Sequence, residues 1–205
     1  NTFSNWTCGS SAVNVLQNSF GGTTNMSSNT ISSITGTGTI VGLQQGSSGT
    51  VATLTIASNS ITSLSSTGSG GAVTAIVSTS APTTGNINGN TINTLSSTST
   101  TATVAGITSS AGVTMNIFSN GINTLSCVGT TSGVTNGILV SGGTTVNVYK
   151  NKIYDLNTSG AFSTTPGVNG ILMSGGTTVN TYNNLIGDLR AAASTSTDAI
   201  RGLSV

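Results

Sequence analysis

The sequence contains very few charged residues. Only four of its 205 residues are Lys or Arg, only three are acidic, and there is no His. All seven charged residues lie at or beyond Lys150, so the first 149 residues carry no charged side chain. Nucleic-acid binding needs clustered Lys and Arg to neutralise phosphates. This composition therefore excludes nucleic acid as a partner.

Side chains for metal binding and acid-base catalysis are equally scarce. The three acidic residues are all Asp, and Cys8 and Cys127 are the only cysteines. A zinc site or a catalytic triad would lack its usual ligands or its His. Three scattered Asp are also a weak basis for a calcium site. We therefore expect no metal and no cofactor.

Long apolar runs are missing too. No run approaches the ~20 residues that a membrane-spanning helix needs, so the chain is not expected to span a membrane. The N-terminus is polar and shows no signal peptide. With 35% hydrophobic residues, the composition still differs from that of a disordered charged tail. We expect one folded domain with a real core.

What the sequence has instead of charge is repetition. The unit Asn-x-Ile-x-x-Leu occurs six times, with Ile in place of Leu in the copy at Asn29, and a looser copy, NTFSNW, opens the chain. The units start at residues 1, 29, 59, 90, 120, 151 and 184, at intervals of 28, 30, 31, 30, 31 and 33 residues. Residues 1–205 are thus interpreted as a single repeat segment. Because it starts at a unit boundary and stops within a unit, we expect it to be a fragment of a longer repeat protein.

Each unit contains three short apolar segments separated by Gly, Ser and Thr, which favours strands joined by turns. The first column of equivalent residues is Phe3, Ile31, Ile61, Ile92, Ile122, Ile153 and Ile186. The second is Val15, Leu43, Ile76, Ile107, Ile138, Ile171 and Leu203. The third is Met26, Ile56, Ile87, Ile117, Val148 and Thr181.

Three strands per ~30-residue period predict an all-β fold, a parallel β-helix (β-solenoid) of about seven coils. Equivalent residues would stack at ~4.8 Å from coil to coil, with the aliphatic columns inside. Cys8 and Cys127 would then lie four coils apart, ~19 Å, beyond the reach of a disulfide. We expect no disulfide between them.

The Asn that starts each unit is interpreted as structural. Asn tolerates a left-handed backbone at a corner, and stacked amides can hydrogen-bond from coil to coil. The residues concerned are Asn29, Asn59, Asn90, Asn120, Asn151 and Asn184.

Two further columns precede these corners and should share one outer face, because residues two apart on a strand point the same way. They form a Thr-x-Asn array made of Thr23, Asn25, Thr53, Thr55, Thr84, Asn86, Thr114, Asn116, Thr145, Asn147, Thr178 and Asn180. Three interpretations remain open: an ordinary exposed strand face, a binding face for a polysaccharide, and an ice-binding face. Asn at the second position in most coils argues against ice.

An aromatic column, Phe118, Tyr149 and Tyr182, stands two residues before three of the corners. It is either a platform for sugars or a cover for the core.

Asp155 and Asp188 are the candidate catalytic pair. They occupy equivalent positions in adjacent coils, so their backbones should lie ~5 Å apart, and glycoside hydrolysis normally uses two carboxylates. The alternative is a surface charge cluster with Lys152 and Arg190. The neutral surroundings favour that alternative.

The segments SGGTTVNVYKNKIYDL, SGGTTVNTYNNLIGDLRA and STSTDAIRGLSV resemble the right-handed parallel β-helix repeats of large secreted proteins of Bacteroidota. Those pectin-lyase-like surface proteins often end in a sorting domain for type IX secretion. The resemblance implies a right-handed fold, a secreted or cell-surface location, and structural or adhesive roles more often than catalysis.

We therefore expect a non-catalytic module of a stalk, adhesin or filament. Its partners would be neighbouring repeats of a longer chain, other copies bound through the solenoid ends, or a polysaccharide. The alternative is a carbohydrate-binding or carbohydrate-active β-helix, and ice binding is the third possibility.

Overall fold

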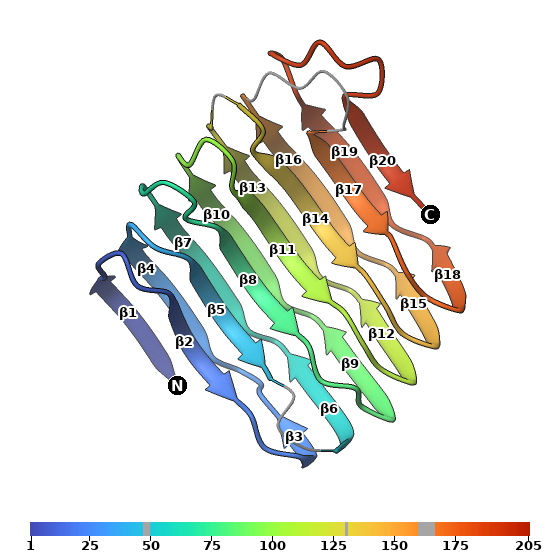
Figure 1. Cartoon of the computed structure of the whole chain (residues 1–205). Coiled ribbons are helices and arrows are strands. Elements are labelled where there is room, and N and C mark those ends of the chain that lie inside the picture. The colour runs from blue at the N-terminus through green and yellow to red at the C-terminus, as the bar shows by residue number, and fades with distance from the viewer. Residues whose placement is uncertain (47–49, 130, 160–166) are drawn as a thin grey trace.

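The computed structural model describes residues 1–46, 50–129, 131–159 and 167–205, and in these ranges every regular element is a β-strand. Three parallel sheets run along the molecule, each built from one strand per coil (Figure 1). Sheet A contains β1 (Thr2–Thr7), β4 (Thr30–Gly36), β7 (Ser60–Ser66), β10 (Thr91–Ser97), β13 (Gly121–Cys127), β16 (Lys152–Thr158) and β19 (Leu185–Arg190). Sheet B contains β2 (Val13–Asn18), β5 (Ile40–Gln45), β8 (Val73–Ser78), β11 (Thr103–Ser109), β14 (Val134–Val140), β17 (Val168–Met173) and β20 (Ile200–Ser204). Sheet C contains β3 (Gly22–Asn25), β6 (Val51–Ala57), β9 (Thr84–Asn88), β12 (Thr114–Phe118), β15 (Thr145–Tyr149) and β18 (Thr178–Tyr182).

This arrangement confirms the predicted parallel β-solenoid. The number of turns differs slightly from the expected seven. Sheets A and B have seven strands, but sheet C has six, because β20 is the last strand of the chain. The molecule therefore makes six complete turns and part of a seventh.

The strands of sheet A contain a regular kink that explains the spacing of their apolar residues. In β10, Ile92 and Leu95 are both fully buried although they lie three residues apart. Strict alternation would place them on opposite faces. Thr94, between them, has a left-handed backbone (φ 57°), and it is skipped in the pairing of β10 with β13. The left-handed residue turns the strand so that both apolar side chains point inward.

The same kink recurs in every coil of sheet A. Its column of left-handed residues, with φ between 50° and 62°, is Asn5, Ser33, Ser63, Thr94, Thr124, Asp155 and Asp188.

The strands of sheet B also have one residue that is skipped in the pairing, and in several coils this residue is glycine. In β5 the pairing with β8 joins Val41 to Thr74 and then Leu43 to Ile76, leaving Gly42 unpaired and inward. The position is crowded in later coils. A Cβ on Gly137 would lie 2.5 Å from the Gly170 carbonyl oxygen and 2.6 Å from Cγ2 of Ile153 in sheet A. In these coils glycine leaves room for the close approach of the backbones and the facing sheet. Val15 in the first coil and Ala75 in the third hold the same position with a side chain.

The core consists of stacked aliphatic columns, as expected. In sheet A, β10 is in register with β7 and β13, so Ile92 lies between Ile61 and Ile122, and all three are fully buried. One assignment was wrong at the N-terminal end. Leu16, not Val15, is paired with Leu43. Val15 is nevertheless buried, because it takes the inward position that Gly42 holds in the next coil.

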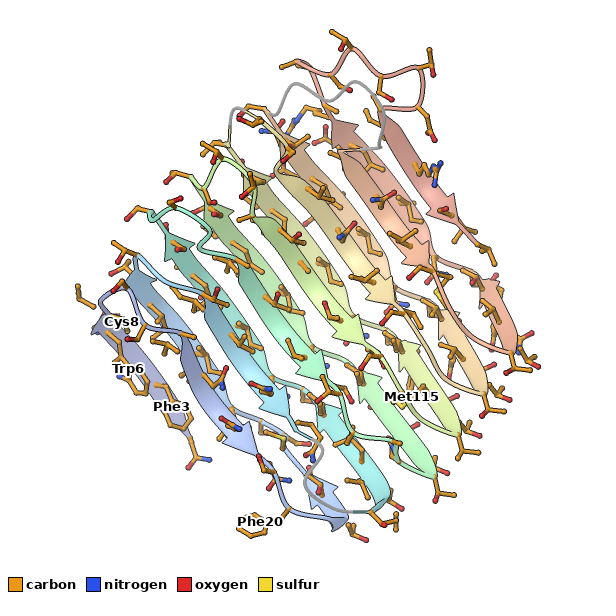
Figure 2. The ribbon with its side chains drawn as sticks, in the orientation of Figure 1. Phe3, Trp6, Cys8, Phe20 and Met115 are labelled. Carbon is orange, nitrogen blue, oxygen red and sulfur yellow. The ribbon has the colours of Figure 1, made fainter. Side chains whose placement is uncertain are left out.

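The first coil carries larger side chains than the coils above it. Figure 2 shows Phe3 and Trp6 on the outermost strand, β1, and Phe20 at the same end of the rod, whereas Met115 lies further along, on β12. Phe20 is 82% exposed, but Met115 is fully buried.

The described residues include no helix of the length and apolar character needed to cross a membrane.

Candidate functional surfaces

The outer face of sheet C carries the Thr-x-Asn array. In β12, Thr114, Asn116 and Phe118 are partly exposed and alternate with the buried Met115 and Ile117. β9 and β15 repeat this alternation in register with β12. All twelve residues assigned to the array are partly or fully exposed. The structure thus brings them together on one surface, and the aromatic column shares it.

The Asn column of this face is bonded to itself. Asn116 Nδ2 donates to Asn86 Oδ1 at 2.9 Å, Asn147 donates to Asn116 at 2.8 Å, and Asn180 donates to Asn147 at 2.8 Å. Each of these amides is therefore already hydrogen-bonded to the amide of a neighbouring coil. A ligand reaching this column would compete with bonds that already exist, so the Asn column is the less favourable part of the face for binding.

The Thr column differs. Among the described residues, no side-chain hydrogen bond joins the hydroxyls of Thr84, Thr114 or Thr145 to another protein group. These hydroxyls stand one per coil, at the ~4.8 Å strand spacing. The Thr column is therefore the part of this face that is available to water or to a repeating polar ligand.

The aromatic column stacks on itself as well. The rings of Phe118 and Tyr149 have centroids 4.9 Å apart with an interplanar angle of 1°, and Tyr149 and Tyr182 are 5.0 Å apart at 5°. Neighbouring rings thus cover each other's faces, and mainly their edges point outward. A sugar platform needs an open ring face, so this geometry favours the role of a cover.

The two candidate catalytic carboxylates lie on the outer face of sheet A, at the left-handed positions of β16 and β19. Arg190 forms ion pairs with both: Nη2 with Asp155 Oδ1, and Nη1 with Asp188 Oδ1 at 3.0 Å. Asp also suits a left-handed backbone better than most residues. Arg190 therefore neutralises much of the pair's charge on an open surface.

Two hollows in the described part of the surface lie away from these carboxylates. One is at the end of the first coil and includes Leu16, Phe20 and Met26 in its lining. Another lies between turns that include Gly38 and Gly71. No acidic or basic side chain lines either hollow, so neither has the carboxylates that glycoside hydrolysis requires.

The Asn residues that start the units form a buried column at the corner between sheets C and A. Asn90 Oδ1 accepts hydrogen bonds from both the backbone N–H and Nδ2 of Asn59. Asn90 Nδ2 in turn donates to Asn120 Oδ1 and to the carbonyl oxygen of Ile56. This network repeats from coil to coil and joins each corner to the next.

The predicted left-handed conformation belongs to a different residue. It lies one position before the corner Asn in each unit, at Ser28, Ser58, Gly89, Ser119, Lys150 and Asn183. The corner Asn instead uses its amide to bond the neighbouring coils.

The cysteines are both free thiols. Cys127 is fully buried, and its Sγ lies 3.4 Å from the carbonyl oxygen of Ala102. Burial raises the pKa of the Cys127 thiol. Ser97 holds the equivalent position in β10, so Cys127 replaces a small polar filler of the interior. Within the described ranges, no group of three or more Cys or Asp side chains could hold a metal ion.

The chain matches no protein-family model, no curated protein and no solved structure. The geometry defines a class of protein, the parallel β-solenoid with a filled interior. A partner would therefore bind to its outer surfaces.

Proposed function

We propose that this chain is a non-catalytic structural module, a rigid element of a stalk, adhesin or filament. The observation that carries the proposal is the corner Asn column. It joins every coil to the next through amide hydrogen bonds, which run from Asn1 to Asn184 and are buried between Asn29 and Asn151. Such a column, beside a filled aliphatic core, resists bending between coils. Stiffness along one axis is the property that a spacer needs.

The surface chemistry agrees with this role. The candidate carboxylates are ion-paired with Arg190 on an open face, and the hollows lack acidic side chains. The resemblance to secreted Bacteroidota β-helix proteins supports a place at the cell surface or in the medium, reached by type IX secretion. Labelling of intact producing cells with an antibody against the purified chain tests that location.

The test against catalysis uses a panel of polysaccharides. Release of reducing ends and formation of unsaturated products are followed for the chain and for the double variant Asp155→Asn, Asp188→Asn. Asn5 occupies the same left-handed position in the first coil, so the variant is expected to keep the fold. We expect no turnover by either protein. Turnover that is lost in the double variant would show a carbohydrate-active enzyme instead.

A second function, binding of a polar polymer, is favoured by the Thr column. Its hydroxyls are spaced regularly and, within the described residues, are not bonded to the protein. Each hydroxyl exchanges a bond with water for a bond with the ligand, at a net gain of only ~0.5–1.5 kcal/mol. Useful affinity must therefore come from many coils acting together. Because this face is neutral, the binding should depend little on salt.

The triple variant Thr84→Tyr, Thr114→Tyr, Thr145→Tyr tests this second function. Its matched control is Thr35→Tyr, Ser65→Tyr, Ser96→Tyr, a column on the outer face of sheet A. Pull-down on insoluble polysaccharides and adsorption to ice are measured for both. Loss only in the sheet C variant assigns the ligand class. If both variants bind polysaccharides and ice as well as the unmodified chain does, the Thr column is not a binding surface.

A further inference from the structure

Four Asn residues of the chain are followed directly by Gly: Asn88, Asn120, Asn136 and Asn169. Asn is among the thermally labile residues of proteins. Its side-chain carbonyl carbon, Cγ, can be attacked by the backbone nitrogen of the next residue. Glycine at that next position favours the attack, because it has no Cβ to obstruct the approach. The structure separates the four pairs by burial and by hydrogen bonding.

Three of the pairs are held inside the molecule. Asn120 is 1% exposed, Asn136 3% and Asn169 2%. The Asn120 amide belongs to the corner column, where its Nδ2 donates to Asn151 and its Oδ1 accepts from Asn90. Asn169 Nδ2 donates to Asn136 Oδ1 at 2.9 Å. Each of these amides would have to leave a buried hydrogen bond before it turned toward its glycine.

Asn88 is different. It is the last residue of β9 and is partly exposed on the outer face of sheet C. Its neighbours in the column are Ala57 on β6 and Phe118 on β12, and neither has a polar side chain. Among the described residues, no hydrogen bond joins the Asn88 amide to another protein group. Figure 1 shows β9 in the middle part of the rod, with coils on both sides. This amide is therefore free to rotate and open to water.

The backbone around Gly89 leaves room for the reaction. Gly89 is left-handed, with φ 62°, and a Cβ built on it would meet its nearest atom only at 3.7 Å. Its N–H donates to the Phe118 carbonyl oxygen at 3.2 Å, whereas the N–H of Gly121, which follows Asn120, donates to Asn90 at 2.9 Å. The bond that holds the Gly89 nitrogen is thus at the long end of the usual range.

We propose that Asn88 is the site at which this chain deamidates in its folded state. The Gly89 nitrogen loses its proton and forms a bond to Cγ of Asn88, the Cγ–Nδ2 bond breaks, and ammonia leaves. A cyclic imide then joins the two residues. Water opens the imide at one of its two carbonyl groups and leaves aspartate or isoaspartate at position 88. Water is the only co-reactant, and no electrons are transferred.

The reaction changes the rod in two ways. The first 149 residues have no charged side chain, so either product places a negative charge on an otherwise uncharged stretch. Isoaspartate also lengthens the main chain by one carbon directly before Gly89 and the buried Asn90, whose amide joins neighbouring coils. Because ammonia is lost to solvent, the converted fraction increases with the age of the folded chain.

The experiment follows the folded 205-residue chain during incubation at pH 8. Samples are digested with pepsin at acidic pH, where cyclisation is slow. Cleavage after Leu95, Leu125 and Tyr149 places the four Asn-Gly pairs in separate peptides, and mass spectrometry measures the mass gain of each. We expect Asn88 to convert at least about tenfold faster than the other three, because those must first open locally. Equal rates at the four pairs, or no conversion at Asn88, overturn the proposal.

The same chain in urea measures the reactivity of the four pairs without the fold. Unfolding removes both the burial and the hydrogen bonds, so the four pairs should convert at similar rates. A preference for Asn88 that persists unchanged in urea would assign the difference to the local sequence and contradict the structural explanation.

Two variants test the chemistry, and neighbouring coils supply the replacements. Gly89→Ser should keep the fold, because Ser58 and Ser119 hold the same left-handed position. Its Cβ obstructs the attack, so conversion at Asn88 should slow at least about tenfold. Asn88→Ala takes the residue that Ala57 provides one coil earlier, and its peptide should show no mass gain.

The remaining outcomes decide the assignment. Conversion at Asn88 that is unchanged in Gly89→Ser would mean hydrolysis without an imide, and a mass gain that persists in Asn88→Ala belongs to another residue. Either result contradicts the proposal. If circular dichroism shows that Gly89→Ser is unfolded, Asn88→Gln replaces it, because the longer side chain would have to close a larger ring and should not convert. These outcomes are independent of the polysaccharide assays, so failure here leaves the proposed structural role standing.

Discussion

Asn59 and Asn90 are joined by two hydrogen bonds that converge on one oxygen. Asn90 Oδ1 accepts from the backbone N–H of Asn59 at 3.0 Å and from its Nδ2 at 2.9 Å. Both residues are 1% exposed. The bond between coils at this corner is thus built from side chains as well as backbone, and its loss leaves buried donors without acceptors.

The first prediction concerns this buried bond. Asn90→Leu should lower the free energy of unfolding by about 3–5 kcal/mol, because two donors of Asn59 and the Ile56 carbonyl lose their partner. Chemical denaturation measures the effect. The control is Asn116→Leu on the outer face of sheet C, where water replaces the lost partners, and it should cost about 1 kcal/mol or less. Equal losses for the two variants would show that burial of the corner column is not what stabilises it.

The second prediction concerns the left-handed kink of sheet A. Thr94 adopts φ 57°, which is costly for a β-branched residue. Thr94→Asn should raise the free energy of unfolding by roughly 0.5–1 kcal/mol, because Asn tolerates this conformation better. Thr91→Asn, on the same strand but outside the kink, is the control and should give no gain. A Thr94→Asn protein that is less stable than the unmodified chain contradicts the explanation.

The third prediction concerns the aliphatic columns. Ile92 is fully buried between Ile61 and Ile122. Ile92→Asp should abolish folding, since the core offers no partner for a buried carboxylate. Ile92→Val keeps the shape and should cost only about 0.5–1.5 kcal/mol. Circular dichroism and thermal unfolding compare the two, and a folded Ile92→Asp protein would place the residue outside the core.

The fourth prediction separates two glycines of sheet B. A Cβ on Gly137 would meet the Gly170 carbonyl oxygen at 2.5 Å and Ile153 Cγ2 at 2.6 Å, whereas on Gly42 the nearest atoms lie at 2.8 and 3.1 Å. Gly137→Ala should therefore be destabilising by about 2–3 kcal/mol. Gly42→Ala should cost clearly less, because Ala75 holds the equivalent position one coil later. The order of the two melting temperatures checks the argument, and the reverse order would refute it.

The fifth prediction concerns thiol reactivity. Burial raises the pKa of the Cys127 thiol above its ordinary value of 9.0, so the reactive thiolate is depleted in the folded protein. Iodoacetamide at pH 8 should modify Cys127 at least about tenfold more slowly in the native chain than in urea. Mass spectrometry of a Cys8→Ser background isolates the effect.

The same shift predicts the direction of a pH effect. The unfolded thiol ionises more readily than the buried one, so this group favours unfolding only once the pH exceeds the ordinary value of 9.0. Cys127→Ser should remove that contribution. Ser fits the site because Ser97 already occupies it one coil earlier. If both proteins lose stability equally above pH 9, another group is responsible.

The sequence alone determined the fold class and the coil register, except in the first coil, where Leu16 and not Val15 aligns with Leu43. The Asn-x-Ile-x-x-Leu period, the alternation in Thr-x-Asn and the absence of charge depend only on local order along the chain. A repeat of short apolar strands can bury its apolar side only by stacking on its neighbours. That is why the repeat period by itself assigns residues such as Ile61, Ile92 and Ile122 to one inner column.

The tertiary structure decided how each column is used. In sequence, the corner Asn90 and the outer Asn116 are similar polar repeats, and Thr84 and Phe118 are both candidates for contact with a ligand. Only the stacked coils show that Asn90 is buried and Asn116 is bonded to Asn86, that the aromatic rings cover each other, and that the Thr hydroxyls stay open. The physical reason is that a side chain's free hydrogen bonds and open faces depend on the residue ~4.8 Å away in the next coil, about 30 positions along the chain.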